Sequence, residues 1–155
     1  MEKNKIEPFK KDWKEIRGRT YEFLDNIPNN KITWKPHKDL GTIGQQIRHI
    51  GVSQRSYING IKIGKIDFND KIFNPEIEKD KEKAINFLKD LDNKLFNILD
   101  NVNIDKKIIF VDGIAGESVI NLKTVLNYLI EHEVYHQGIF TCYGRLLGLG
   151  KFRFM

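Results

Sequence analysis

The spacing of apolar residues between Pro75 and Ile98 restricts the fold of this chain more than any other feature of the sequence. They recur at heptad-like intervals with charged residues on the opposite face, and the stripe consists of Ile77, Ala84, Leu88, Leu91, Leu95 and Ile98. This pattern predicts one amphipathic helix that starts near Pro75. Such a helix is stable when its apolar stripe packs against other elements, so the pattern also requires partner helices or a sheet.

Three more segments show helical periodicity, and no regular alternation of strands and helices is present. They run from Phe9 to the residue before Pro28, from about Thr42 to the glycines Gly60 and Gly64, and over residues 122–147. The connections are a Pro-containing loop over residues 28–41, a loop over residues 69–76, and β-favouring runs over residues 107–120. The sequence therefore predicts an all-α fold, an up-and-down or crossover four-helix bundle with a short β-hairpin or an extended crossing between helices three and four.

Length and composition indicate a single domain over residues 1–155 in a reducing compartment. A chain of 155 residues with 40% hydrophobic content can bury a core, and its one cysteine, Cys142, rules out an internal disulfide framework. No apolar run reaches the roughly 20 residues of a membrane span. The 26 Lys and Arg are mixed with 21 Asp and Glu, which is not typical of a nucleic-acid-binding face. We expect a cytoplasmic protein that contacts neither membrane nor nucleic acid.

The string HEVYH at residues 132–136 places two histidines one helical turn apart on the apolar face of the predicted helix, so both are expected to occupy core positions. A histidine on an apolar face is commonly a hydrogen-bonded core residue, but two imidazoles at this spacing can also converge on one metal ion. His49 lies on a helix face with small and polar neighbours, which leaves room for a third ligand beside an open coordination position. His37, in the loop over residues 28–41, is expected at the surface or at a pocket rim.

H-E-x-x-H on a helix is also the pattern of zinc proteases, whose third ligand follows further along the chain. The remainder after His136 contains no Asp, Glu or His, and a mostly helical chain of this length lacks a sheet to align a peptide. The sequence thus disfavours a protease. Glu133 is then expected to be a residue flanking the metal ligands or a solvent-exposed residue, and Cys142 a small buried hydrophobe.

The strings IGQQIRHI (43–50) and EHEVYHQGIFTCYGRLLG (131–148) together resemble the DinB-like superfamily of bacterial metal-binding helical bundles. Members of that superfamily carry one histidine on helix two and an H-x-x-x-H pair on helix four. The resemblance covers nearly the whole chain. Family members commonly continue with R-G-Q after the second histidine, whereas this chain has Gln137 in place of the Arg and Ile139 in place of the Gln.

The resemblance implies a divalent transition metal, most simply Zn or Ni, held by His49, His132 and His136. It also implies a thiol transferase in which a bacillithiol-like small thiol attacks an electrophilic small molecule, and we expect a homodimer. The electrophile would enter a gap lined by Ser53, Ser56 and Tyr57, while Trp34 and Arg145 are expected to be packing and surface residues. The rival hypothesis is a non-catalytic metal-binding bundle of the stress-response type. An open coordination position favours catalysis, and a closed one favours structure.

Overall fold

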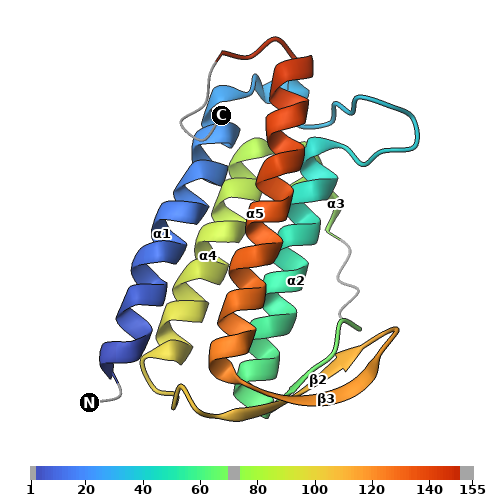
Figure 1. Ribbon diagram of the computed structural model, residues 1–155. Helices are drawn as coiled ribbons and strands as arrows, with labels where there is room; N and C mark the ends of the chain where they lie inside the picture. Colours follow the sequence, from blue (N-terminus) through green and yellow to red (C-terminus); the bar gives the residue numbers. More distant parts are fainter. Residues whose placement is uncertain (1–2, 70–73, 151–155) are drawn as a thin grey trace.

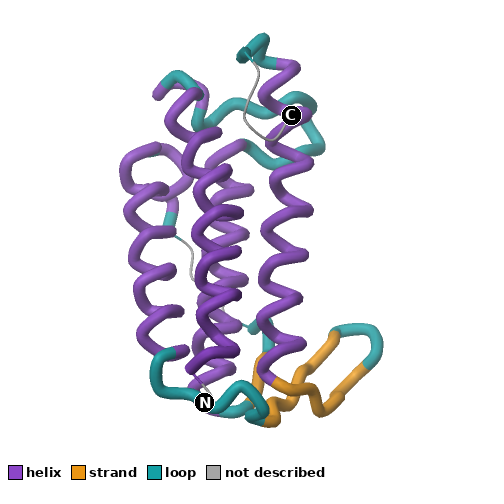
Figure 2. The backbone as a smooth tube through the Cα atoms, turned by 60° about the vertical axis from the view of Figure 1, so that its left-hand side comes forward, coloured by secondary structure: helices purple, strands orange, loops and turns teal. Residues whose placement is uncertain are grey.

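Four long helices lie side by side in the computed structural model of the chain, which describes residues 3–69 and 74–150 (Figure 1). They are α1 (Lys3–Asn26), α2 (Ile43–Ile63), α4 (Lys81–Leu99) and α5 (Leu122–Leu146). The shorter elements are the 3₁₀ helix η1 (Asn29–Lys31), helix α3 (Pro75–Lys79) and the strands β1 (Lys65–Ile66), β2 (Lys107–Asp112) and β3 (Gly116–Asn121). The fold is mostly helical, as predicted, with a small sheet at one end of the helices (Figure 2). No helix in these described ranges is long and apolar enough to cross a membrane.

Helix α2 begins and ends at the residues that the sequence indicates. Thr42 and Gln45 form a reciprocal capping box, in which the Thr42 hydroxyl accepts from the Gln45 backbone N–H and the Gln45 side chain accepts from that of Thr42. Gly64 ends the helix in the left-handed conformation, with φ 89°, and its N–H donates to the Gly60 carbonyl oxygen at 2.8 Å. These two caps fix the segment that carries His49.

The single helix predicted from Pro75 is instead two helices, α3 and α4. The chain turns at Asp80, whose backbone is extended (φ −126°, ψ 114°) and whose carboxylate accepts a hydrogen bond from the Lys83 N–H at 3.0 Å. The apolar spacing continues through this break, so periodicity alone does not reveal it. An aspartate that can bond the N–H groups of a following turn favours a helix start over a helix interior. Of the predicted loop over residues 69–76, residues 70–73 lie outside the described residues.

Helix α1 begins before the predicted start at Phe9, and it includes Pro8. Proline removes one helical hydrogen bond, which argues for a later start. Burial compensates, because Ile6 and Phe9 are 4% and 8% exposed and pack in the core. Tertiary packing therefore extends the helix beyond the limit that local preference sets.

The small sheet contains the hairpin of β2 and β3 and a third strand that the sequence does not predict. Strands β2 and β3 pair antiparallel, and the Asp112 carboxylate accepts from the N–H groups of Ile114 and Ala115 at the turn. Strand β1 pairs parallel with β2, with Lys65 opposite Ile109. Two residues are too few to show strand alternation, so β1 leaves no sequence pattern.

Buried apolar residues form two clusters, with a layer of buried polar residues between them. The cluster at the sheet end includes Trp13, Ile61, Leu95 and Leu126. The cluster at the opposite end includes Phe23, Ile47, Leu88 and Phe140. Between them on the four long helices lies a polar layer, which we define as Arg17, Thr20, Gln54, Asp92, Glu133 and Gln137. This layer is the level at which the candidate site is found.

Gly44 on α2 allows the close approach of α3, which leads to a stability prediction. A Cβ at this position would collide with the backbone carbonyl of Glu78, and backbone cannot move aside as a flexible side chain does. We expect Gly44→Ala to lower the free energy of unfolding by about 1–3 kcal/mol, the usual cost of overpacking. Urea unfolding measures the loss.

Gly18→Ala on α1 is the matched control for this prediction. A Cβ at Gly18 would meet nothing within 4 Å, so this substitution is expected to stabilise the helix slightly, by up to about 1 kcal/mol. Equal effects of the two substitutions would show that α3 does not pack closely on α2.

Candidate metal centre

Three histidines meet where α2 and α5 face each other. The Nε2 atoms of His49 and His132 are 3.2 Å apart, and one ligand nitrogen from each of the three rings lies within 4.8 Å of the others. His136 is 4% exposed, His132 is half-buried and His49 is exposed. The cluster therefore has a buried inner side on α5 and an open side towards solvent. The structure brings together the three histidines that the sequence analysis selects.

The histidines lie at the edge of the buried face of α5, not at its centre. The prediction that both His132 and His136 occupy core positions is wrong for His132. The buried stripe at this level consists of Leu129, Glu133, His136, Gln137 and Phe140. Because Glu133 follows His132 by one residue, it points about 100° away around the helix. The carboxylate thus takes the core position and the ring of His132 the edge position.

All three imidazoles are held in the neutral form. Burial, together with the neighbouring histidines, lowers the pKa of His132 to about 4 and that of His136 to about 3. The pKa of His49 is also lowered, first by partial loss of hydration and then by the positive charge of Arg48. A neutral imidazole has a lone pair available on one nitrogen, so the cluster presents three ligands at neutral pH.

The geometry of the cluster fits one divalent ion. Two nitrogens that each lie about 2.0–2.1 Å from a tetrahedral ion are roughly 3.3 Å apart. The 3.2 Å between the Nε2 atoms of His49 and His132 agrees with this value, and the ligand nitrogens of all three rings lie within 4.8 Å of one another. The Nδ1 atom of His136 is buried and has no hydrogen-bond partner in the described part of the chain. Three neutral imidazoles that converge, one of them with an unpartnered buried nitrogen, are better explained by a cation site than by hydrogen bonds alone.

A pocket of about 540 Å³ opens in front of the histidines. Its wall combines apolar and amide side chains with the three rings, and the lining residues are Leu40, Gln45, Gln46, His49, His132, Tyr135, His136 and Ile139. We call it the histidine pocket. Tyr135 is 68% exposed and meets the His136 ring edge-on, with ring centroids 5.3 Å apart. An apolar rim beside an open ligand cluster suits a small organic molecule.

Ser53, Ser56 and Tyr57, the predicted substrate-binding residues, are not part of the lining of the histidine pocket. All three are buried, and the Ser56 hydroxyl donates to the Val52 carbonyl oxygen of the preceding turn. The space that Gly60 would leave on the same helix is occupied by Ile66 of β1. The pocket extends towards the start of α2 instead. Sequence reasoning missed the lining residues Leu40, Tyr135 and Ile139, which read as ordinary helix or loop positions.

The remaining predicted residues divide into correct and incorrect assignments. His37 is exposed, as expected of a surface residue. Trp34 packs edge-on against Tyr143, with ring centroids 5.7 Å apart, and Arg145 is exposed, so both predictions are confirmed. The prediction for Cys142 is wrong, because the thiol-bearing residue is exposed on the outer face of α5.

Glu133 is not a solvent residue. It is 1% exposed, it accepts a hydrogen bond from the Thr20 hydroxyl, and its Oε2 lies 3.5 Å from Nη2 of Arg17. Burial raises the pKa of Glu133, and the Arg17 charge partly opposes that rise. The carboxylate is absent from the lining of the histidine pocket. It therefore has no path to act as the general base of a zinc protease.

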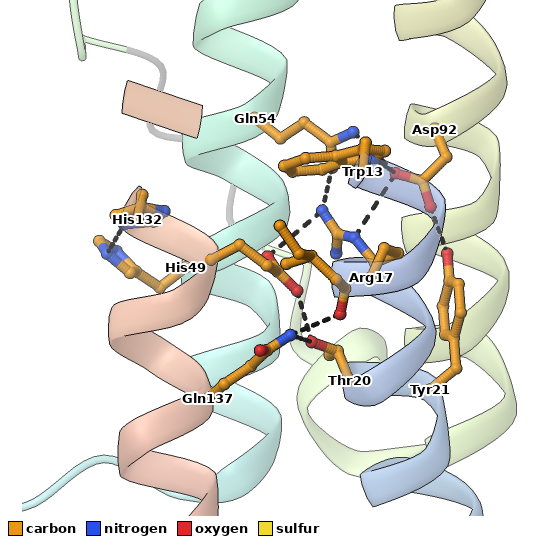
Figure 3. Close-up of polar contacts among 11 residues, drawn as sticks. Trp13, Arg17, Thr20, Tyr21, His49, Gln54, Asp92, His132 and Gln137 are labelled. Carbon is orange, nitrogen blue, oxygen red and sulfur yellow. Dashed lines mark hydrogen bonds and ion pairs between the residues drawn. The ribbon is translucent and has the colours of Figure 1, made fainter. Parts of the chain in front are cut away.

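The polar layer is a group of interacting residues that sequence reasoning missed. Arg17 donates to Oε1 of Gln54 at 2.7 Å and lies over the Trp13 ring, 4.8 Å from its centroid (Figure 3). Asp92 on α4 accepts from the Trp13 indole at 2.8 Å and from the Tyr21 hydroxyl at 2.6 Å. The sequence contained one signal of this layer. Arg17 follows Trp13 by four residues and precedes Thr20 by three, so it lies on the same helix face as these residues of the α1 stripe. A charged residue inside such a stripe indicates a buried charge.

Long helices around a core, with histidines converging from two of them, define a helical protein with a candidate metal centre. The chain belongs to the DinB family, whose family model matches residues 1–154.

Two solved structures share the fold. A DinB-like protein from Bacillus subtilis is 20% identical, with a TM-score of 0.72, and a DinB-like protein from Bacillus cereus ATCC 10987 is 18% identical, with a TM-score of 0.71. Each comparison covers 94% of both chains. No curated protein matches this chain significantly.

Proposed function

We propose that this protein is a divalent-metal-dependent enzyme of the thiol-transferase type. The observation that carries the proposal is the open side of the histidine cluster, where three neutral ligands face a pocket instead of a closed coordination sphere. His49, His132 and His136 would hold a zinc- or nickel-like ion. The thiol co-substrate, of the bacillithiol kind, is supported by the family resemblance and by the chemistry of such an ion.

A bound divalent cation favours the thiolate over the thiol and so supplies a nucleophile at neutral pH. In the transfer itself, the sulfur forms a bond to an electrophilic carbon, the leaving group departs with its electron pair, and the thiol proton passes to solvent.

The residues around the histidine pocket would bind the electrophile. Leu40 and Ile139 give the histidine pocket apolar wall residues, and the exposed Tyr135 ring offers a face on which an apolar electrophile can lie. Ser53, Ser56 and Tyr57 stay proposed substrate-binding residues.

The test begins with protein purified without a nickel column. Its metal content is measured first, and the protein is then incubated with a panel of small thiols, bacillithiol included, and of electrophiles such as epoxides and alkyl halides. Loss of thiol and formation of the thioether are followed together. Turnover that requires both metal and thiol supports the proposal. Stoichiometric metal binding without turnover across the panel would favour the non-catalytic metal-binding bundle.

The lowered histidine pKa values give a prediction for the pH dependence of metal affinity. A ligating histidine must be neutral, so protons compete with the metal only near or below the pKa of each ring. An ordinary histidine titrates near 6.5, whereas His132 and His136 titrate at about 4 and 3. We expect affinity to be nearly constant from pH 8 to about 6.5 and to fall progressively from there towards pH 4, as protons compete for His49, whose pKa lies below 6.5, and then for His132. Competition titrations with a chelator of known affinity measure this profile.

The opposite profile would be informative. An affinity that already falls steeply between pH 8 and pH 7 would show that the rings titrate at or above the ordinary value, contrary to their burial. An affinity indifferent to pH down to 4 would indicate carboxylate ligands instead of imidazoles.

A further inference from the structure

The two histidines of the cluster on α5 are each followed directly by a buried polar residue that faces another side of the helix. Glu133 follows His132, and Gln137 follows His136. Because successive residues project about 100° apart, each pair directs one side chain to the histidine pocket and the next towards α1. In Figure 3, His132 and Gln137 extend from opposite sides of α5, and Gln137 meets Thr20 of α1.

Both buried side chains bond to the same turn of α1. Glu133 accepts from the Thr20 hydroxyl and pairs with Arg17, with the two charged groups 3.5 Å apart. The Gln137 amide donates to the Ile16 carbonyl oxygen and to the Thr20 hydroxyl, the latter at 3.2 Å. Thr20 therefore connects the two residues. Helix α1 itself contributes none of the three histidines.

Directional contacts of this kind fix the rotation of a helix in a way that apolar packing does not. Leu, Ile and Phe side chains tolerate small rotations or shifts of α5, because dispersion contacts are non-directional. Hydrogen bonds weaken steeply when their angles change, and a buried polar group that loses its partner is costly. A rotation of α5 that broke the contacts with Thr20 would also move His132 and His136 relative to His49.

We propose that Glu133 and Gln137 are positioning residues that set the rotation of α5 on α1 and so hold His132 and His136 in register with His49. The inference rests on the proposed function in one respect, that the histidine cluster binds a divalent ion. Groups behind metal ligands typically change metal affinity by roughly 10–100-fold when they are removed. Here the support acts through the helix backbone instead of through a bond to the imidazole.

The experiment titrates metal-free protein with Co²⁺, whose absorption spectrum reports both affinity and ligand geometry. We expect Glu133→Ala and Gln137→Ala to weaken cobalt binding about 10–100-fold and to shift its visible absorption bands. Glu133→Gln retains an acceptor for Thr20, so its binding is expected to stay within about threefold of the unmodified protein. Thr20→Val removes the shared partner at nearly constant volume and is expected to weaken cobalt binding as the two alanine substitutions do. It therefore provides the test if either alanine variant fails to fold.

Asp92→Asn and Tyr21→Phe are the matched controls, because both lie in or beside the polar layer without a hydrogen bond to α5 in the described contacts. Each is expected to lower the stability of the fold but to leave the cobalt affinity and spectrum unchanged. If affinity instead follows the loss of stability in all variants alike, or if Thr20→Val and both alanine variants bind as the unmodified protein does, the positioning role is refuted while the metal site stands. If the unmodified protein binds no cobalt, the metal site and the positioning role are both refuted.

Discussion

Replacing His136 with alanine is expected to abolish binding of a divalent ion under conditions in which the unmodified protein binds about one ion per chain. Apparent free energies of about 10–16 kcal/mol are typical of four-ligand zinc sites, or roughly 2.5–4 kcal/mol for each ligand. A cluster with three ligands that loses one should therefore bind the ion about 10²–10³-fold more weakly. His136 is the most buried of the three rings, so no water-exposed side chain can replace it without repacking α5.

Elemental analysis after dialysis, followed by titration calorimetry, measures this effect. His132→Ala and His49→Ala are expected to behave in the same way, since their Nε2 atoms lie 3.2 Å apart on the open side of the site. His37→Ala is the matched control, because that ring is exposed in the loop before α2 and belongs to no cluster of ligands among the described residues. One ion per chain retained in both α5 variants would show that the metal is held elsewhere.

The course of the helices could be predicted because it depends on local patterns. Three- and four-residue spacing marked each long helix, and the capping residues Thr42 and Gly64 marked both ends of α2. The break at Asp80 and the strand β1 could not be predicted in this way. Asp80 interrupts a helix whose apolar stripe continues unchanged, and β1 exists only because Lys65 and Ile66 pair with β2.

The metal ligands could be selected from the sequence, but their surroundings could not. Histidine is rare in this chain, and spacing on one helix brings His132 and His136 together. That His49 lies at their level depends on how α2 and α5 are aligned, which only the packed structure shows. The same packing decides which side chains of α2 line the histidine pocket, Gln45 and Gln46 among them.

The buried charges were missed for a physical reason. Arginine, aspartate and glutamate are solvated in most proteins, so they are read as surface residues unless a partner is visible. The partners of Arg17 lie on three other helices, at Gln54, Asp92 and Glu133, and sequence separation conceals them. The position of Arg17 within an apolar stripe was the available signal. At this residue, position in the stripe predicts burial correctly, whereas the charged residue type does not.

The burial of Arg17 leads to the second large expected effect. Arg17→Met should lower the free energy of unfolding by about 3–5 kcal/mol, the cost of removing one partner from a buried ion pair. Arg17 is 1% exposed and lies 3.5 Å from both Asp92 and Glu133, so its loss leaves two carboxylates without their counter-charge. Urea unfolding, followed by circular dichroism and by the fluorescence of the two tryptophans, Trp13 and Trp34, measures the change.

Arg19→Met is the matched control on the same helix. Arg19 pairs with Glu15 at 2.9 Å on the exposed face, and its removal should cost no more than about 0.5 kcal/mol. A triple variant that adds Glu133→Gln and Asp92→Asn to Arg17→Met should recover much of the lost stability, because no unpaired charge then stays buried. Similar losses in the Arg17 and Arg19 variants would show that the polar layer is not held by its charges.

The pH dependence of the Arg17→Met variant provides an independent check on the same mechanism. Burial already raises the pKa of Glu133, and the Arg17 charge is what holds that rise back. Without Arg17, the folded state should bind a proton at Glu133 more tightly than the unfolded chain does. A carboxyl group whose folded pKa lies above its unfolded value loses stability as pH rises. The deficit of the variant relative to the unmodified protein should therefore be larger at pH 8 than at pH 5, whereas an equal deficit at both would indicate lost packing of the arginine side chain instead of lost charge.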